Sequence, residues 1–491
     1  MDRNVLNAKL DKMFYPASVA VVGASEVPVK WGNLILTSIL GWEFKGKVFP
    51  VNPKKDTILG LPCYPSITAI PEAVDLAVLV IPAPHIPGAM RECAAKGISA
   101  AVVISSGFRE MGEEGARIER DTVEIARDGG IVFMGPNTMG IASAHGRLEA
   151  LPTPTGPKPG GLSIISQSGN LGLQILKWIA HKGIGLSIYA GTGNEAMLHA
   201  GDLLAYMGGK DEVKAVAMYM EGITDGREFM EIASEVTRRK PVIALKAGRS
   251  QAGSKAAQSH TGSMAGSYAT YKAMFSQAGI VQVSTPSELL DTSAALTLLP
   301  IPRTNRVAVM TMGGGWGIIA ADECEDRGLV LPPLSPEIIA DLDTKLPQYW
   351  NRRNPVDVVG EGDPELYLHV IGALARWKEV DSVIALGIVG RSGYVEDFIA
   401  CQERLDGKLY SRELKLAVLK AQIQAEDRVM SGISRIQKET GKPILVVGLK
   451  EEGLTMRETD YGAVISLSSP EEAVNIIAHM AGYGRYLAGL K

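Results

Sequence analysis

The clearest candidate for chemistry in this chain is His260, which lies in the segment "AAQSHTGSMAGS" over residues 256–267. A neutral imidazole exposes a ring lone pair near pH 7, so it can act as a nucleophile towards phosphoryl groups. The small neighbours of His260, together with Gly253, Gly262 and Gly266, predict a pliable loop that lets the ring travel between two sites. These residues alone leave a second interpretation open, a surface histidine without a function.

A phosphate cradle is predicted in "LSIISQSGN", where an apolar strand runs into Gln167, Ser168, Gly169 and Asn170 and then into a helix. The first N–H groups of a helix and its dipole attract an anion. An ordinary N-cap by Ser168 explains the same residues, and both interpretations can hold together. Glu221, in "AVAMYMEGI", follows another apolar strand, at the kind of sheet edge where ligand sites form. A carboxylate at such a place can hold one nitrogen of an imidazole, and the alternative is a carboxylate that is only solvated at the end of the strand.

Short apolar β-branched runs alternate with amphipathic stretches almost throughout the chain, which predicts parallel sheets covered by helices on both faces. The proline-rich linker "EALPTPTGPKPGG" over 149–161 and the junction "TLLPIPRTN" over 297–305 interrupt this alternation. We therefore expect an α/β protein of three tandem doubly wound domains, over residues 1–146, 147–300 and 301–491.

The first expected domain opens with a strand, a glycine turn and a helix start in "SVAVVGASEVPVKWGN" over 18–33. Gly23 and Gly32 do not have the spacing of a dinucleotide fingerprint, and the second strand ends in "VNPKK" in place of the acidic residue that binds an NAD ribose. Lysines at that position favour a nucleotide with an extra phosphate, such as coenzyme A. The alternative is that Gly23 only closes a tight turn and the lysines are solvated.

Composition narrows the class of protein further. The net charge of −4 and the lack of a basic stripe argue against nucleic acid, and no apolar run approaches the roughly 20 residues that a membrane span needs. The first residues lack the apolar core of a signal peptide. The four cysteines, Cys63, Cys93, Cys324 and Cys401, have no metal-ligand spacing, so we expect no metal site, reduced thiols and a cytoplasmic protein.

Taken in order, the motifs "SVAVVGAS", "VNPK", "VIPA", "SSGFRE", "MGPN", "IISQSGNLG", "GTGNEA", "YMEGI", "SHTGS", "TMGGGWG" and "NPVDV" resemble the ADP-forming acyl-CoA synthetases. That family belongs with succinyl-CoA synthetase, and the resemblance covers essentially the whole chain. It implies a Rossmann-like CoA-binding domain followed by two flavodoxin-like domains. It also implies the reversible conversion of acyl-CoA, ADP and phosphate to a small carboxylic acid, ATP and CoA.

No segment matches the ATP-grasp module of the fused family members. The resemblance therefore implies an α subunit that works with a separately encoded ATP-grasp β subunit in an α2β2 heterotetramer. ATP or ADP and Mg²⁺ are then expected mainly on the β subunit. Trp316, in "GGGWG", stands where the family usually has a small residue or proline, so the role of that loop is left open.

The resemblance also assigns roles to individual residues. It implies that His260 is phosphorylated, that Glu221 orients its ring, and that the helix start at 167–170 holds the phosphate. The turns holding Asn137 and Asn194 are expected beside the same cleft. The residues implied to contact CoA are Gly23, Ser25, Lys30, Asn52, Lys54, Ile81, Pro82, Ser106, Gly107 and Asn137.

Two other functions remain open at this point. A regulator that binds CoA or a nucleotide without turnover predicts that His260 can be lost without consequence. A CoA-dependent acyltransferase predicts that no phosphorylated enzyme forms.

Overall fold

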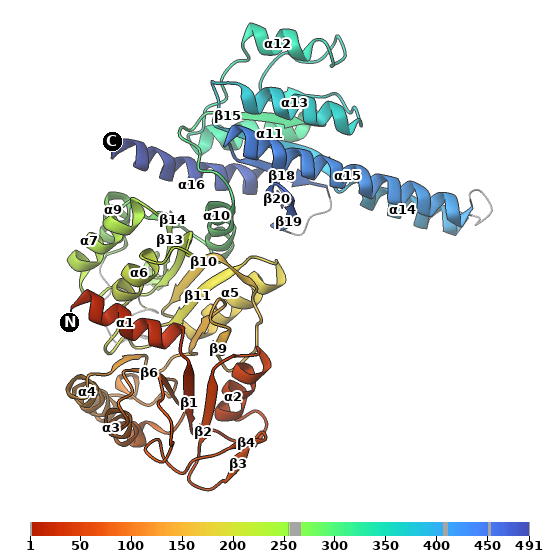
Figure 1. Ribbon diagram of the computed structural model, residues 1–491. Helices are drawn as coiled ribbons and strands as arrows, with labels where there is room; N and C mark the ends of the chain where they lie inside the picture. Colours follow the sequence, from red (N-terminus) through yellow and green to blue (C-terminus); the bar gives the residue numbers. More distant parts are fainter. Residues whose placement is uncertain (1, 254, 256–266, 406–410, 450–452, 491) are drawn as a thin grey trace. The chain divides into compact units, whose positions relative to one another are not determined.

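The computed structural model describes residues 2–253, 255, 267–405, 411–449 and 453–490. They form two compact units, Met1–Ser293 and Ala294–Lys491 (Figure 1). The first unit contains two large sheets and the second contains one, and helices cover them. This confirms the predicted α/β class with doubly wound parallel sheets, whereas the division into three domains stays a prediction.

The first sheet of the first unit is parallel throughout, in the order β2-β1-β5-β6-β7. Its central strands are fully buried apolar runs, as a sheet covered on both faces requires. The chain passes from β1 to β2 on one side of β1 and then crosses to β5 on its other side. The loops that follow β1 and β5 therefore leave the sheet in opposite directions, and the switch point of the sheet lies between these two strands. The strands are β1 (Ser18–Val22), β2 (Lys47–Val51), β5 (Leu76–Leu79), β6 (Ala100–Val103) and β7 (Val132–Met134). The helices are α2 (Trp31–Gly41), α3 (Ile86–Lys96) and α4 (Glu113–Asp128), and a small hairpin joins β3 (Thr57–Ile58) to β4 (Leu61–Pro62).

The second sheet has the order β14-β13-β12-β10-β11-β8-β9. Strands β8 and β9 add an antiparallel edge to an otherwise parallel sheet. Its switch point lies between β10 and β12, because β11 and β12 flank β10 on opposite sides. The strands are β8 (Ile141–Ser143), β9 (Leu148–Ala150), β10 (Pro159–Ser166), β11 (Leu186–Gly191), β12 (Ala215–Met220), β13 (Val242–Lys246) and β14 (Val281–Val283). The helices are α5 (Gly169–His181), α6 (Ala200–Gly208), α7 (Gly226–Thr237) and α9 (Tyr268–Gln277).

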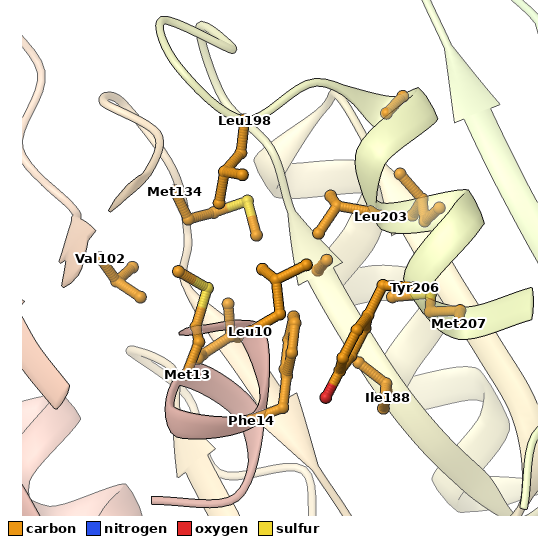
Figure 2. Packing of buried hydrophobic residues seen from close by; sticks show 14 of the residues in the cluster. Leu10, Met13, Phe14, Val102, Met134, Ile188, Leu198, Leu203, Tyr206 and Met207 are labelled. Atoms are coloured by element: carbon orange, nitrogen blue, oxygen red, sulfur yellow. The ribbon is translucent and has the colours of Figure 1, made fainter. Parts of the chain in front are cut away.

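The N-terminal helix α1 (Arg3–Phe14) packs against β6 and β7 of the first sheet and against β8 and helix α6 of the second (Figure 2). Asp2 caps it by accepting hydrogen bonds from the first N–H groups. Leu10, Met13 and Phe14 are completely buried, and the Phe14 ring stacks on Tyr206 with 5.7 Å between the ring centroids. These contacts join segments almost 200 residues apart into one hydrophobic core.

The sheet of the second unit is parallel except for its last edge strand, in the order β16-β15-β17-β18-β20-β19. The strands are β15 (Val307–Thr311), β16 (Val356–Asp357), β17 (Ser382–Val389), β18 (Ile444–Gly448), β19 (Thr455–Thr459) and β20 (Gly462–Leu467). The helices are α11 (Gly314–Asp326), α12 (Pro336–Leu342), α13 (Pro364–Arg376), α14 (Arg391–Leu405), α15 (Arg412–Thr440) and α16 (Pro470–Gly489), and α10 (Pro286–Leu298) spans the boundary between the units. The pair α14 and α15 extends well beyond the sheet (Figure 1). No helix in the described part of the chain is long and apolar enough to cross a bilayer.

Candidate functional site

A cleft of about 890 Å³ lies in the first unit, where loops at the carboxyl ends of both sheets meet. The loop after β5 contributes Val80, Ile81 and Pro82, and the loop after β10 contributes residues 167–170. Both switch points therefore open onto one cavity, which is the position at which doubly wound sheets bind ligands. The remaining lining residues are Trp31, Ile104, Ser105, Ser106, Arg109, Glu110, Asn137, Thr138, Met139, Gly193, Asn194 and Glu221.

The start of α5 has the properties of an anion cradle. Ser168 occupies the N-cap position with extended backbone angles, but its side chain makes no capping hydrogen bond. The first N–H groups of a helix have no acceptor within the helix, and they carry the positive end of its dipole. A Cβ atom on Gly169 would lie 2.6 Å from Cγ of Met139, so the backbone approaches the cleft wall closely here. Ser168, Gly169 and Asn170 all line the cleft, as the sequence predicts for a phosphate site.

Gln167 lines the same cleft but is occupied by protein partners. Its amide nitrogen donates to the Glu195 carboxylate and to the Gly222 carbonyl oxygen, both at 2.8 Å. Its amide oxygen accepts hydrogen bonds from the backbone N–H groups of Glu221 and Gly222. The backbone N–H of Gln167 donates to the Tyr219 carbonyl oxygen at 3.2 Å. No donor of Gln167 is left for a phosphate in this arrangement, so the residue ties the loop after β10 to the turn at Glu221.

The turn at Glu221 is also held by two residues beside the His260 segment. Lys246, at the end of β13, is only 5% exposed and donates from Nζ to the carbonyl oxygens of Glu221 at 2.8 Å and Ala247 at 2.6 Å. Burial lowers the pKa of Lys246, although the Glu221 charge opposes this. Tyr271, in α9, accepts the Ile223 N–H at its hydroxyl oxygen, and its ring centroid lies 4.5 Å from the ammonium nitrogen of Lys246.

Lys246 precedes the segment that contains His260, and α9 follows it. The carboxylate turn is thus contacted by one residue that precedes that segment, Lys246, and by one that follows it, Tyr271. His260 itself lies outside the described residues, so its distance from Glu221 stays a prediction.

The two asparagine turns come together on the wall of the cleft. The Asn137 side-chain amide donates to Oδ1 of Asn194 at 3.3 Å. The Asn194 amide donates to Glu110 at 2.7 Å and to Glu119 at 3.0 Å. Burial alone would raise the pKa of Glu110, but hydrogen bonds from Asn194 and from backbone N–H groups outweigh it, and the pKa is lowered. The loop "SSGFRE" of the first sheet and the loop "GTGNEA" of the second are therefore joined.

Four of the residues expected to contact CoA line the cleft, namely Ile81, Pro82, Ser106 and Asn137. The other six, Gly23, Ser25, Lys30, Asn52, Lys54 and Gly107, lie outside its lining. The Gly23 N–H donates to the Val51 carbonyl oxygen. The position admits only glycine, because Gly23 has a φ of 90° and a Cβ atom there would lie 2.4 Å from the Val80 carbonyl oxygen. Asn52 donates to the Ala24 oxygen at 2.9 Å. Gly23 and Asn52 therefore shape the loops at the switch point.

Lys30 and Lys54 are exposed near these loops, where their positive charges are available to solvent. Gly107 donates its N–H to Glu110 at 2.7 Å. Gly32, which follows nine residues after Gly23, would carry a Cβ 2.0 Å from the Gly23 oxygen, so the two glycines allow α2 to pack against the loop after β1.

Several lining residues were not predicted from the sequence. Trp31 begins α2, and Arg109 and Glu110 lie at the end of the motif "SSGFRE", whose first residues alone were expected to bind. The motif was the available signal for Arg109. Arg109 forms an ion pair with Glu119 at 3.4 Å and donates to the Asn194 carbonyl oxygen.

A smaller cavity of about 110 Å³ lies behind Glu221, between α6 and α7. His199 and Glu195 line it, with 3.8 Å between Nδ1 and the carboxylate. The hydrogen-bonding interaction with Glu195 raises the pKa of His199, whereas burial works in the opposite direction. Glu195 thus contacts both the Gln167 side chain and the His199 imidazole.

Comparison with known proteins places this geometry in a family. Residues 17–144 match the family model described as a CoA binding domain, and residues 159–296 match the succinyl-CoA ligase like flavodoxin domain. The chain is 42% identical to acetate–CoA ligase [ADP-forming] II subunit alpha of Pyrococcus furiosus, over 77% of this chain and 82% of that one.

The chain belongs to the ADP-forming acetate–CoA ligase family. The predicted family is thereby confirmed, and its members are acid–thiol ligases.

Two further members of the ADP-forming acetate–CoA ligase family show how much of the chain is shared. Acetate–CoA ligase [ADP-forming] I of Archaeoglobus fulgidus is 42% identical over 81% of this chain, which spans 57% of that longer protein. The structure of a dinucleotide-forming acetyl-coenzyme A synthetase 1 from Ca. Korarchaeum cryptofilum, in complex with phosphate and ADP, superposes with a TM-score of 0.83. It is 31% identical and covers 98% of this chain and 97% of its own. The second unit therefore shares the fold of this family as well.

Proposed function

We propose that this chain is the α subunit of an ADP-forming acyl-CoA synthetase, which converts acyl-CoA, ADP and phosphate to a carboxylic acid, ATP and CoA in a reversible reaction. One observation carries the proposal. The cleft combines the switch point of the CoA-binding-type sheet with the helix start and carboxylate of the second sheet. A thioester and a phosphate bound to these two walls come together in one cavity.

The cleft residues fit the chemistry of CoA. Trp31, Val80, Ile81 and Pro82 offer an apolar wall for the pantetheine arm, and Ser106 offers a hydroxyl group. Lys30 and Lys54 supply positive charge near the switch-point loops, which suits the phosphates of the nucleotide portion. The start of α5 holds inorganic phosphate through the N–H groups of Ser168, Gly169 and Asn170.

The reaction is proposed to proceed in two transfers. The phosphate held at α5 attacks the thioester carbonyl carbon, the carbon–sulfur bond breaks, and CoA leaves as its thiolate, which takes up a proton. His260 then attacks the phosphorus of the acyl phosphate and releases the carboxylate. Glu221 accepts a hydrogen bond from the other ring nitrogen and stabilises the positive charge on the imidazole. The phosphoryl group passes from His260 to ADP, whose phosphates are neutralised by Mg²⁺ in transfers of this type.

The nucleotide site is proposed to lie on a second polypeptide. Relatives from Pyrococcus furiosus are named as alpha subunits, which supports a separate partner. We propose an ATP-grasp β subunit, an α2β2 assembly and a cytoplasmic location. The acyl group stays open, because the relatives differ in it: one is named for acetate, one for 4-hydroxybutyrate and one for trans-feruloyl-CoA.

The test is the phosphorylated histidine. The chain is mixed with its β partner and ATP carrying labelled γ-phosphate, and acid-labile, alkali-stable label on the α chain is measured. We expect wild type and the matched control His181→Gln, an exposed histidine at the end of α5, to be labelled, and His260→Ala to be unlabelled. Labelling of His260→Ala at the wild-type level refutes the nucleophile assignment. A wild-type chain without label, but with acyl transfer between CoA and another acceptor, indicates the acyltransferase alternative.

A further inference from the structure

Glu195 lies between the Gln167 side chain and the small cavity that His199 lines. Its carboxylate is 8% exposed and divides its two oxygens between two partners. Oε1 accepts the hydrogen bond from Nε2 of Gln167 at 2.8 Å, and Oε2 lies 3.8 Å from Nδ1 of His199. The transfer steps proposed above give no role to Glu195 or to His199.

The backbone of Glu195 indicates that this placement is maintained at a cost. Its φ of 53° lies in the left-handed region, which a residue with a side chain rarely adopts. Such conformations persist only where the surrounding contacts determine them, and they cluster at functional sites. Glu195 does not line the cleft, so its carboxylate can act on the reaction only through another residue.

Gln167 connects Glu195 to the carboxylate turn. Its amide oxygen accepts hydrogen bonds from the N–H groups of Glu221 and Gly222, and its amide nitrogen donates to the Gly222 carbonyl oxygen and to Glu195. An ionised carboxylate can only accept, so Glu195 favours the orientation in which the amide oxygen faces the turn. Hydrogen bonds to a charged group are roughly twice as strong as neutral ones. Loss of the Glu195 carboxylate therefore loosens the turn that presents Glu221.

Acidic side chains surround His199 in the small cavity. The lining includes Glu195 from the loop after β11, Asp202 from α6, and Asp225 and Glu228 from the start of α7. Among the described residues that line this cavity, His199 is the only one that can carry a positive charge. The interaction with Glu195, together with the charges of Asp202 and Glu228, raises the pKa of His199 although burial opposes it. Protonated His199 therefore offsets the negative charge of Glu195.

We infer that Glu195 is a positioning residue of the phosphoryl-transfer site, which holds the Glu221 turn through Gln167 and is supported by protonated His199. The inference rests on the proposed function, since the position of Glu221 matters only if its carboxylate orients the imidazole of His260. Without Glu195 that carboxylate is held less firmly, and transfer from the acyl phosphate to the imidazole slows. When His199 loses its proton, the charge of Glu195 is no longer offset and repels the anionic acyl phosphate.

The experiment separates the two phosphoryl donors of the proposed reaction. The full-length chain with its β partner is labelled either from acetyl phosphate, whose phosphorus–oxygen bond breaks to release acetate, or from ATP, which releases ADP. Acetyl phosphate is the smallest acyl donor, so it fits a pocket that accepts any larger acyl group. Glu195→Met removes the acceptor, and Glu195→Gln keeps an acceptor oxygen without the charge. The matched control is Glu231→Met, at an exposed carboxylate on α7 outside the small cavity.

We expect Glu195→Met to slow labelling from acetyl phosphate about 10-fold, as the loss of a ligand-orienting residue does in metal sites, and to leave labelling from ATP within about 2-fold of wild type. Labelling from ATP takes place at the nucleotide site proposed for the β subunit, so it reports that the fold and His260 are intact. Glu195→Gln should recover most of the rate, and the control should match wild type. Equal rates for Glu195→Met and wild type, or an equal loss with both donors, overturn the inference. A wild-type chain that takes no label from acetyl phosphate refutes the proposed reaction instead.

The pH profile of the acetyl phosphate rate tests the part given to His199. His199→Asn removes the charge but keeps a side chain that is favoured at the N-cap of α6. Across the two intervening side chains, protonated His199 should make wild type about 3-fold faster than His199→Asn. This ratio should fall towards one as the pH rises through the pKa of His199, which lies above its usual value. A ratio that stays constant from about pH 6 to about pH 9 overturns the support assigned to His199.

Discussion

Replacing Gln167 by glutamate tests whether its amide group holds the two loops of the cleft together. The two side chains have nearly the same shape, so packing is preserved and only the hydrogen-bond donor is lost. In the structure the amide nitrogen donates to the carboxylate of Glu195, which is 8% exposed, and to the Gly222 carbonyl oxygen. Ionised glutamate in Gln167→Glu places an oxygen at both contacts, opposite two acceptors.

The size of the effect follows from the bonds lost. A hydrogen bond to a charged group is worth about 1.5–3 kcal/mol and one to a neutral carbonyl about 1 kcal/mol. These losses amount to about 2.5–4 kcal/mol, and the new carboxylate also repels Glu195, so we expect Gln167→Glu to lower the unfolding free energy by about 3–5 kcal/mol at pH 8, where the new carboxyl is ionised. Protonation restores one donor, so the loss at pH 5 falls to about 1–2 kcal/mol. Because the unfolded carboxyl is itself mostly ionised at pH 5, a difference near 2–3 kcal/mol between pH 5 and pH 8 corresponds to a folded-state pKa raised to about 7.

The direction of the pH dependence is fixed by this raised pKa. A carboxyl whose folded-state pKa is raised stabilises the fold below its unfolded pKa, near 4.3, and this stabilisation is lost as the pH rises through the folded value. The deficit of Gln167→Glu relative to wild type should therefore grow from about pH 4 to pH 8.

Because the chain has two units, the measurement must report on the first unit alone. Hydrogen exchange in urea, followed by mass spectrometry of peptides from β10 and β12, satisfies this requirement. Gln167→Met is the control, since it removes the donor contacts, together with the two hydrogen bonds that the amide oxygen accepts, without adding a charge. It should lose about 2–4 kcal/mol at every pH between 5 and 8. An unchanged stability of Gln167→Glu, or a loss that is the same at pH 5 and pH 8, would refute the role given to the amide.

Three further outcomes are expected. Lys246→Met should lower the unfolding free energy by about 1–3 kcal/mol, because the partly buried carbonyl groups of Glu221 and Ala247 lose their donor. It should also slow phosphorylation of the chain, and hydrogen exchange and the labelling assay measure the two effects. Gly172→Ala should cost about 1–3 kcal/mol in urea unfolding, because the new Cβ would lie 2.2 Å from the buried Tyr189 hydroxyl oxygen. In NMR, the pKa of the His199 imidazole should lie above its usual value, and in Glu195→Gln this pKa should fall towards the usual value. The stability that the ion pair contributes should therefore be present below about pH 6.5 and fade as the pH rises through the folded-state pKa.

The strand-and-turn positions of the cleft could be predicted from the sequence because they depend on local pattern. An apolar run followed by a glycine turn and a helix start identifies the end of a strand. For this reason Ser168, Gly169, Asn170 and Glu221 were placed at sheet edges that the structure brings to one cavity. The motif order supplied the family, which the comparisons confirm.

The roles within the site were harder to predict, since they depend on contacts between distant segments. Gln167 stands in the phosphate motif, yet its hydrogen bonds go to residues 28 to 55 positions away. Lys246 ends an ordinary buried strand, and only the structure shows its ammonium group beneath the carboxylate turn.

The docking of α1 has a consequence for how this chain is made. Leu10, Met13 and Phe14 emerge from the ribosome before Tyr206, against which Phe14 stacks and which follows almost 200 residues later. At a synthesis rate of roughly 5–20 residues per second, the apolar side of this helix waits about 10–40 seconds for this part of its binding surface. During that interval it is a natural substrate for chaperones.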